Sequence, residues 1–449
     1  MLVAAFVALP AADEYWIRNA RVPGVFLRQP VAAAADAEGS VLVDVCVARG
    51  LVSAVVPSGQ VLLSALPSVD LGKRQLWPTL VDMHTHIDKS QLIGRIGSLG
   101  VSFAKAREAI NTDRARHWSA EDIRRRMEFS IRCAYVHGVS AIRSHIDSYQ
   151  GQAEASWEAF AEIRARWAGR VTLQATSSVP IDVYTTDYGR RLADIAAATE
   201  GGLLGGVVRR STDQVAGYID NVSALLDAQF SLAKARGLAI DLHVDETLKG
   251  EDTHLGEIAM AVMRHGLEGR VVCSHCCSLS VLPDEKVASL LALCARAGLG
   301  IVTLPTSNMY LHDRALGRTP RLRGVTLAHE IRAKNIPFAI ASDNVRDAFY
   351  PFGDYDMLDL FRQSVGIYHL DQCLGEAVGM VGPAPARMMG VEPLGSLSVG
   401  APANLILLNA RSINELVSRP QADRMVLNAG RRVTDALPDF SELDVSNNL

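Results

Sequence analysis

Histidines and acidic residues recur where short apolar runs end in this 449-residue chain. In WPTLVDMHTHIDKS, residues 77–90, the apolar part ends in His84-Thr85-His86. Alternate residues of a β-strand point to the same side, so both imidazoles can reach one metal ion. A third imidazole from His243 in DLHVDE and a carboxylate from Asp343 in IASDN would complete a His3Asp set. Such a set suits one Zn²⁺ or Fe²⁺ per subunit and leaves a position for water.

Candidates for moving protons lie beside these ligands. A bound metal lowers the pKa of water from ~15.7 toward ~7, so hydroxide would be available at neutral pH. Glu246, three residues beyond His243, can lean over the cavity as the acid/base. His275 in VVCSHC would orient the hydroxide or polarise a substrate, and Asp343 would also accept the water proton. Two structural alternatives stay open: Glu246 as a carboxylate at a helix N-terminus, and His275 as a core histidine.

These residues need strands that bring their carboxyl ends to one cavity. From residue 76 to about 345, β-rich runs alternate with stretches of helical period. The eight runs expected to be strands cover 76–84, 140–147, 171–178, 204–209, 238–246, 270–276, 299–307 and 337–344. Eight strands with intervening helices predict an α/β fold, a (β/α)8 barrel of the TIM type, with the reacting groups at the carboxyl ends of its strands.

The two ends of the chain have another pattern, of short alternating runs between Gly and Pro. They predict one small β-sandwich domain formed by both ends, with boundaries at 1–75, 76–384 for the barrel, and 385–449. Within the barrel, segment 119–138 predicts a helix that begins after Ser119 and ends at Gly138. Further helices are expected near 155–167, 219–236, 254–265 and 284–297.

The composition excludes several classes of protein. Hydrophobic residues make up 49% and charged residues 21% of the chain, with a formal charge of -4, so neither nucleic acid nor a membrane is an expected partner. The seven cysteines are odd in number and scattered, as in a reducing compartment. We therefore expect a cytoplasmic protein with a small-molecule substrate, and a barrel of this size can form a homo-oligomer.

The motifs also resemble a known family. VDMHTHIDKS, AIRSHID, DLHVDE, VCSHC and IASDNVRDAFYPFGDYDML occur in an order and spacing similar to the amidohydrolase superfamily, most of all its cytosine deaminase branch, which includes N-isopropylammelide amidohydrolase. The resemblance spans about residues 15 to 435. It implies the same roles: His84, His86, His243 and Asp343 as metal ligands, Glu246 as proton shuttle and His275 beside the hydroxide. Binuclear members carry a carboxylated Lys after strand 4, and LLGGVVRR has none, so one metal is implied.

The chain departs from the cytosine deaminase pattern at two positions. Those enzymes carry a Gln shortly after strand 3, and the resemblance places Pro180 there, which has no side-chain amide. Asn344 stands where cytosine deaminases have a second Asp, and an amide both donates and accepts. Asn308 in LPTSNMYLHDR matches a position that the family places near the substrate, with an exposed loop as the alternative. Arg143 is expected to pair a buried carboxylate such as Asp147.

Together these features predict a metal-dependent hydrolytic deaminase of an amino-substituted N-heterocycle: a pyrimidine, triazine, pterin or purine-like compound. Pro180 and Asn344 make cytosine itself a weaker candidate. Metal-bound hydroxide would attack, with Glu246 as proton shuttle. The alternative is an amidohydrolase acting on a cyclic amide or an N-alkylamino heterocycle. A non-catalytic metal-binding scaffold is the third reading, and the presence of Glu246, His275 and Asp343 counts against it.

Overall fold

The computed structural model describes residues 6–60, 65–97, 102–213, 217–420 and 423–444. Within them the chain forms two compact units, each made of separate segments. The end unit comprises Met1–Asp82, Cys133–Ala141 and Asp356–Leu437, and the barrel unit comprises Met83–Arg132, Ile142–Tyr355 and Pro438–Leu449. The boundaries expected at 75/76 and 384/385 stay a prediction.

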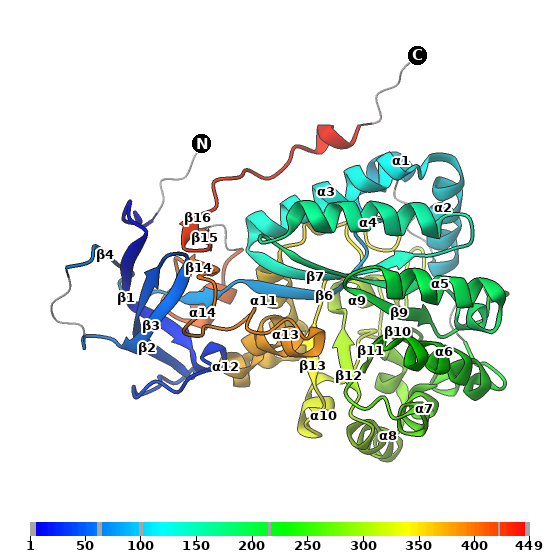
Figure 1. Ribbon diagram of the computed structural model, residues 1–449. Helices are drawn as coiled ribbons and strands as arrows, with labels where there is room; N and C mark the ends of the chain where they lie inside the picture. The colour runs from blue at the N-terminus through cyan, green and yellow to red at the C-terminus, as the bar shows by residue number, and fades with distance from the viewer. Residues whose placement is uncertain (1–5, 61–64, 98–101, 214–216, 421–422, 445–449) are drawn as a thin grey trace. The chain divides into compact units, whose positions relative to one another are not determined.

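Eight strands follow one another around a parallel sheet in the order of the sequence (Figure 1). They are β6 (Leu80–Thr85), β7 (Val139–Asp147), β8 (Thr172–Ser178), β9 (Gly202–Val207), β10 (Ile240–Val244), β11 (Val271–His275), β12 (Gly300–Thr303) and β13 (Phe338–Ile340). The sheet closes just after β13, where the Asp343 backbone N–H donates to the His84 carbonyl oxygen at 2.8 Å. The predicted (β/α)8 barrel is confirmed.

The barrel strands are buried on both faces, which explains their nearly continuous apolar runs. Every residue of β6, β7, β10, β11, β12 and β13 is buried. Strand β9 has a glycine, Gly205, where its neighbours approach closely. A Cβ on Gly205 would lie 2.2 Å from Thr176 Oγ1 and 2.6 Å from the Asp241 carbonyl oxygen. Glycine at this position therefore lets β8, β9 and β10 pair.

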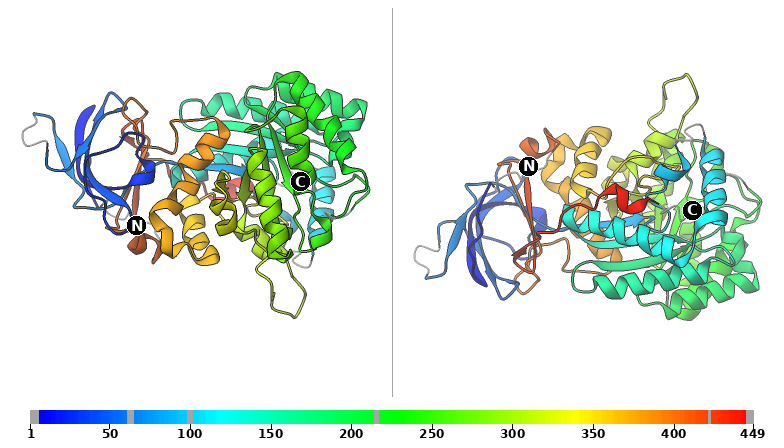
Figure 2. Two further views of the ribbon diagram at one scale, coloured as in Figure 1. Left: turned by 90° about the horizontal axis from the view of Figure 1, so that it is seen from below. Right: turned by 90° about the horizontal axis from the view of Figure 1, so that it is seen from above.

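Helices connect the strands and lie outside them, as the views in Figures 1 and 2 show for α5 to α8, drawn in green. They are α1 (Ile93–Ile96), α2 (Phe103–His117), α3 (Ala120–His137), α4 (Ala153–Trp167), α5 (Asp187–Ala198), α6 (Val222–Arg236), α7 (Leu255–His265), α8 (Asp284–Arg296), α9 (Pro305–Leu311) and α10 (Ala328–Ala333). Ser119 Oγ accepts from the Asp122 N–H at 3.2 Å, and α3 ends before Gly138, as predicted. Among the described helices, none is long and apolar enough to cross a membrane.

The end unit contains two four-stranded sheets built from both ends of the chain. One has the order β3-β2-β1-β4, with β1 (Glu14–Pro23), β2 (Ser40–Ala48), β3 (Leu51–Pro57) and β4 (Ser68–Asp70). The other has the order β16-β15-β14-β5, with β5 (Leu76–Pro78), β14 (Leu405–Leu408), β15 (Arg424–Asn428) and β16 (Arg431–Arg432). Strand β4 pairs with β1 in parallel, and the other pairs of the two sheets are antiparallel. The small β-domain expected from both chain ends is confirmed.

The run 76–84, expected as one barrel strand, is two strands. Residues 76–78 form β5, which pairs with β14 in the end unit, and only β6 belongs to the barrel. Trp77 explains the break, because its ring is fully buried against Phe26 and Phe361 of the end unit, at ring-centroid distances of 5.4 and 6.0 Å. Pro78 and Thr79 then lead into the barrel.

The rest of the described chain consists of short helices and turns. Helices α11 (Met357–Tyr368), α12 (Leu374–Ala377), α13 (Pro383–Met389) and α14 (Ile413–Val417) belong to the end unit. Short 3₁₀ helices span Gly24–Phe26, Ile181–Thr185, Gly250–Asp252, Cys277–Val281, Leu370–Cys373, Val378–Val381 and Phe440–Leu443. All seven cysteines are free thiols, and six of them are buried.

Candidate active site

Histidines from four strands meet one carboxylate at the carboxyl end of the barrel. They are His84 on β6 and His86 just after it, His145 on β7, His243 on β10 and His275 on β11, and none is more than 7% exposed. His86 Nε2 lies 3.2 Å from Asp343 Oδ1, and His84 Nε2 lies 3.7 Å from the same oxygen. Ligand atoms of His84, His243, His275 and Asp343 all lie within 4.8 Å of one another.

Hydrogen bonds behind the first two imidazoles decide which nitrogen faces the cluster. His86 Nδ1 lies 3.0 Å from the His145 carbonyl oxygen, which can only accept, so Nδ1 carries the proton and Nε2 the lone pair. His84 Nδ1 lies 2.8 Å from Ser274 Oγ, whose own proton points to Asp241 Oδ1 at 3.4 Å. Both rings therefore present a basic Nε2 toward Asp343.

These nitrogens fit a metal ion better than a simple buried cluster. His84 Nε2 has no hydrogen-bond partner among the described residues, although a buried polar atom left unpaired costs about 1–3 kcal/mol. Burial lowers the pKa of His84, His86 and His243 well below the ordinary histidine value, so the rings are neutral and free to donate lone pairs. Neutral imidazoles around one carboxylate form a donor set suited to a divalent cation.

Glu246 and His275 lie side by side at the edge of the cluster. Glu246 Oε1 is 3.5 Å from His275 Nδ1, and Asn308 Nδ2 is 3.0 Å from the same nitrogen. An amide N–H can only donate, so His275 Nδ1 accepts and its Nε2 carries the proton. Burial, and then the nearby Asp343 charge, raise the pKa of the Glu246 carboxyl well above its ordinary value. His275 is thus arranged as a hydrogen-bond donor and Glu246 as a group that can carry a proton.

Two of these residues have a backbone conformation that residues other than glycine rarely adopt. His275 has φ 73° and Asp343 has φ 62°, both in the left-handed region. Such a conformation costs about 1–3 kcal/mol and persists where the surrounding structure enforces it, often at functional sites. In both cases the turn comes directly at or after the end of a barrel strand and points the side chain at the cluster.

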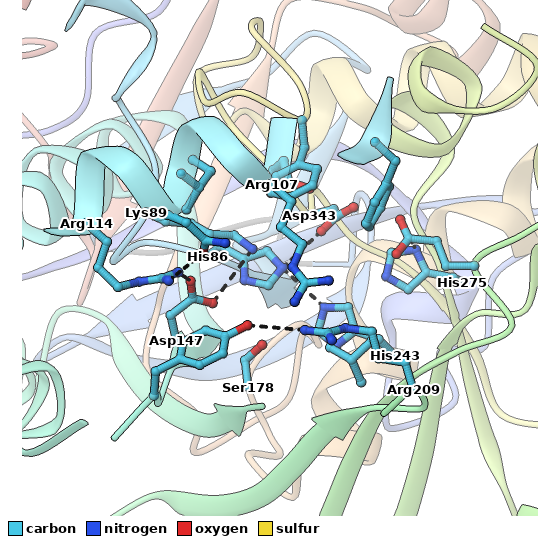
Figure 3. A pocket seen from close by; sticks show the side chains of 18 residues that line it. His86, Lys89, Arg107, Arg114, Asp147, Ser178, Arg209, His243, His275 and Asp343 are labelled. Atoms are coloured by element: carbon cyan, nitrogen blue, oxygen red, sulfur yellow. Dashed lines mark hydrogen bonds and ion pairs between the residues drawn. The ribbon is translucent and has the colours of Figure 1, made fainter. Parts of the chain in front are cut away.

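A pocket opens above the cluster and lies entirely in the barrel unit (Figure 3). Apolar side chains form part of its wall: Phe103, Ile110, Val207 and Phe349. Four cationic side chains also line it: Lys89, Arg107, Arg114 and Arg209. Asn111, Asp147, Tyr149 and Ser178 add polar groups. The pocket therefore offers flat apolar surface and positive charge close to the histidines.

Most of the residues predicted from sequence come together here. His86, His243, Glu246, His275, Asp343 and Asn344 line the pocket, and His84 lies in the cluster beneath. Asn308 lies in α9 rather than a loop, is fully buried, and contacts His275 instead of lining the pocket. Pro180 is buried and bridges to Val207, and the nearby lining residue is Ser178.

Other residues of the site had no assigned role in the sequence. The centroid of the His145 ring lies 3.8 Å from that of the His84 ring. Arg143 was expected to pair with Asp147, but it donates to the Asp241 carboxylate at 2.8 Å. Asp241 was detectable in principle, since it precedes His243 by two residues and must face the same side of β10. Arg107 was not, because its position depends on how α2 packs.

Known proteins match this chain over nearly its whole length. A curated pterin deaminase from Rhizobium rhizogenes (strain K84) is 43% identical over 441 residues, 98% of each chain. N-isopropylammelide isopropyl amidohydrolase from Pseudomonas sp. (strain ADP) is 27% identical over 350 residues, 75% of this chain and 80% of the other. The crystal structure of 5-methylcytosine deaminase from Klebsiella pneumoniae superposes with a TM-score of 0.80 at 22% identity, covering 94% and 98% of the two chains.

A family model matches as well, over residues 99–434, and its description is "Amidohydrolase family". The resemblance inferred from the strand-end motifs is thereby confirmed, as is the expectation of a hydrolytic enzyme that acts on C–N bonds. The chain belongs to the amidohydrolase family.

Proposed function

We propose that this protein is a metal-dependent deaminase that hydrolyses the exocyclic amine of a pterin-type heterocycle. The observation that carries the proposal is the cluster of neutral, buried imidazoles and Asp343 beside Glu246 at the base of a pocket. The pterin deaminase, 43% identical over 98% of both chains, supports the substrate class. Pterin is also among the substrate classes predicted from the sequence, whereas Pro180 and Asn344 weaken cytosine as a candidate.

The metal would be held by His84, His86, His243 and Asp343. Their basic nitrogens and the carboxylate face one another, whereas His275 has its proton on Nε2 and so is a hydrogen-bond donor instead of a ligand. When bound, one Zn²⁺ or Fe²⁺ would acidify water and polarise the substrate.

Three side chains of this protein would then handle protons. Glu246 takes a proton from the attacking water and delivers one to the departing amino group, so ammonia leaves and a ring carbonyl remains. The His275 Nε2–H donates a hydrogen bond to the oxygen that adds to the ring carbon, which stabilises its developing negative charge. Asp343 can accept the second proton of the water.

The pocket wall supports a flat, bicyclic ring. Phe103, Phe349 and Val207 offer apolar faces to it. The Asn344 amide N–H donates to Asp347 Oδ2 at 2.7 Å, so the Asn344 carbonyl oxygen remains for a donor on the substrate, such as a ring N–H. Pro180 does not line the pocket. Ser178, two residues earlier, contributes a hydroxyl to the pocket wall instead.

A panel of heterocycles tests the reaction. Ammonia release should be observed with pterin and should be far slower with cytosine, a monocyclic triazine and guanine. The alternative is a hydrolase of a cyclic amide or an N-alkylamino heterocycle, in line with the similarity to N-isopropylammelide isopropyl amidohydrolase. It would be supported if pterin gave no ammonia while an N-alkylamino heterocycle released an alkylamine or a lactam ring opened.

Replacing Glu246 tests the proton shuttle. Glu246→Gln keeps the size of the side chain but cannot carry the proton, so turnover should fall by about 10³-fold or more while the metal content stays unchanged. The matched control is Glu251→Gln, which changes an exposed residue in the same β10–α7 connection. A Glu246→Gln variant with a normal rate would remove Glu246 from the mechanism.

A further inference from the structure

Two arginines of the pocket wall converge on one backbone oxygen. Arg107 of α2 donates to the Asp213 carbonyl oxygen at 2.7 Å, and Arg209, two residues after β9, donates to the same oxygen at 3.2 Å. Arg209 is only 4% exposed and Arg107 is half-buried. Figure 3 shows the two guanidinium groups next to each other in the pocket, beside His243.

The hydrogen bonds of Arg209 go to neutral oxygens. Besides the Asp213 carbonyl, they are the Arg210 carbonyl at 3.0 Å and the Tyr149 hydroxyl at 3.3 Å. Burial lowers the pKa of Arg209, and the positive charge of Arg107 works in the same direction. Two cations held together in this way repel each other, and an anion placed between them would relieve that repulsion.

Two carboxylates whose charges act on Arg209 accept hydrogen bonds from the segment after β9. Asp213 Oδ2 accepts from the Arg210 backbone N–H at 2.9 Å. Asp182 accepts from the backbone N–H of Ser211 at 3.0 Å and from its hydroxyl at 2.8 Å. These contacts fold the segment after β9 into place. The charges of Asp182 and Asp213 raise the pKa of Arg209, but burial lowers it by more.

The other two cations of the pocket differ, because a carboxylate lies between them. Arg114 forms an ion pair with Asp147, and Lys89 Nζ lies 4.0 Å from the same side chain. Arg209 thus differs from Arg114, because its hydrogen bonds go to neutral oxygens. This part of the wall adjoins the catalytic cluster, since Arg209 lies beside His243 in the pocket (Figure 3).

We propose that Arg107 and Arg209 form an anion-binding subsite that holds a carboxylate or phosphate carried by the substrate, while the amino-bearing ring carbon faces Glu246 and His275. The inference rests on the proposed deaminase function and specifies its substrate as an anionic heterocycle. A planar guanidinium presents a fork of N–H donors that matches either anion, and two such forks fix its orientation. Tyr149 would then position Arg209 through its hydroxyl.

The test compares a neutral substrate with anionic ones. The probes are pterin, pterin carrying a carboxylate on its pyrazine ring, and 6-hydroxymethylpterin esterified with phosphate, each assayed by ammonia release on the metal-loaded enzyme. The wild type should use at least one anionic probe about 10-fold or more better than pterin, measured as kcat/KM. The preferred probe identifies the anion as a carboxylate or a phosphate.

Substitutions then connect the preference to the arginines. Arg209→Met and Arg107→Met should each lower kcat/KM for the preferred anionic probe by about 10- to 100-fold, chiefly through KM, so that the ratio of kcat/KM between this probe and pterin falls about 10-fold or more. Arg107→Met keeps the test decisive if loss of the buried Arg209 disturbs folding. The control is Arg116→Met, an exposed arginine on the same helix, which should leave the ratio between probes unchanged.

Three results would contradict the subsite. Equal use of neutral and anionic probes by the wild type, or an equal loss on both in the arginine variants, would refute it and leave the proposed deaminase function intact. No ammonia from any of the three pterins would refute the proposed function, and the subsite with it.

Discussion

At the scale of single residues, the orientation of His84 depends on a chain of buried hydrogen bonds. Arg143 donates to Asp241 Oδ2 at 2.8 Å, Ser274 donates to Asp241 Oδ1 at 3.4 Å, and His84 Nδ1 lies 2.8 Å from Ser274 Oγ. All four side chains are buried. The chain holds the Nδ1 proton of His84 on the protein side and its Nε2 lone pair toward Asp343.

Breaking this chain should weaken metal binding. Ser274→Ala removes the acceptor of the His84 proton, so the ring can rotate or change tautomer, and we expect the metal affinity to fall about 10- to 100-fold. Competition with a chromogenic chelator measures the dissociation constant directly. Ser289→Ala, on the exposed side of α8, should not change it. An unchanged affinity in Ser274→Ala would show that packing alone orients His84.

The sequence predicted the residues on strands better than those beyond them. His84, His86 and His243 could be placed together because strand parity and a shared strand end are local rules. The contact of Asn308 with His275 could not, since it depends on the helix α9 that follows β12. The roles of metal ligand, proton shuttle and substrate contact stay predictions for the variants proposed here.

At the scale of elements, Arg95 joins the three helices that follow β6. Its guanidinium, on α1, binds the Asp113 carboxylate of α2 at 2.7 Å and the Asp122 carboxylate of α3 at 2.6 Å. Burial would raise the pKa of Asp122, but the hydrogen bonds and charges of Arg95 and Arg126 outweigh it and hold the pKa at about 2. Helix α2 carries Arg107 and Arg114, so this junction also supports the pocket wall.

This junction should make the folded state sensitive to acid. Asp122 has a pKa of about 2 in the folded protein and about 3.9 when unfolded, so its stabilising effect is complete above pH 4 and is lost as the pH falls toward 2. At pH 7, Asp122→Asn should lower the free energy of unfolding by about 2 to 3 kcal/mol.

Denaturant unfolding at a series of pH values measures this effect. The difference between wild type and Asp122→Asn should shrink as the pH approaches 2. Glu121→Gln changes the exposed neighbour in the same helical turn and should alter stability by less than about 1 kcal/mol. A difference that stays constant with pH would mean that Asp122 acts through packing rather than through its charge.

Element boundaries show where sequence reasoning reached its limit. Seven of the eight expected barrel strands appear close to the expected positions, because buried parallel strands have long apolar runs. The remaining run, 76–84, is divided at Trp77-Pro78. The sequence could not show this division, because β5 pairs with β14, whose residues lie more than 300 positions away in the chain. The helices α9, α10, α12, α13 and α14 have only four to seven residues each, which is too short to show a helical period in the sequence.

At the scale of the whole molecule, the metal cluster exists only when the barrel is closed. Thr85 Oγ1 donates to the Asp343 carbonyl oxygen at 2.8 Å, and the two residues are 258 positions apart in the chain. The Asp343 N–H binds the His84 carbonyl oxygen at the same junction. Closing such a long loop is entropically costly, so a ligand that holds both strand ends stabilises the complete barrel.

Removing the metal should therefore lower the melting temperature of the protein. Without a cation, Asp343 and Glu246 repel each other, and His84 Nε2 lacks a partner. A ligand present at about 1,000 times its dissociation constant adds about 4 kcal/mol, which corresponds to about 8 to 16 °C in a unit of about 250 residues. Calorimetry before and after dialysis against a chelator measures the shift, with the metal content followed in parallel. In a His84→Ala/His86→Ala variant the chelator should have no effect, since its ligands are missing. If the wild type loses its metal and its melting temperature does not change, metal binding does not stabilise the closed barrel.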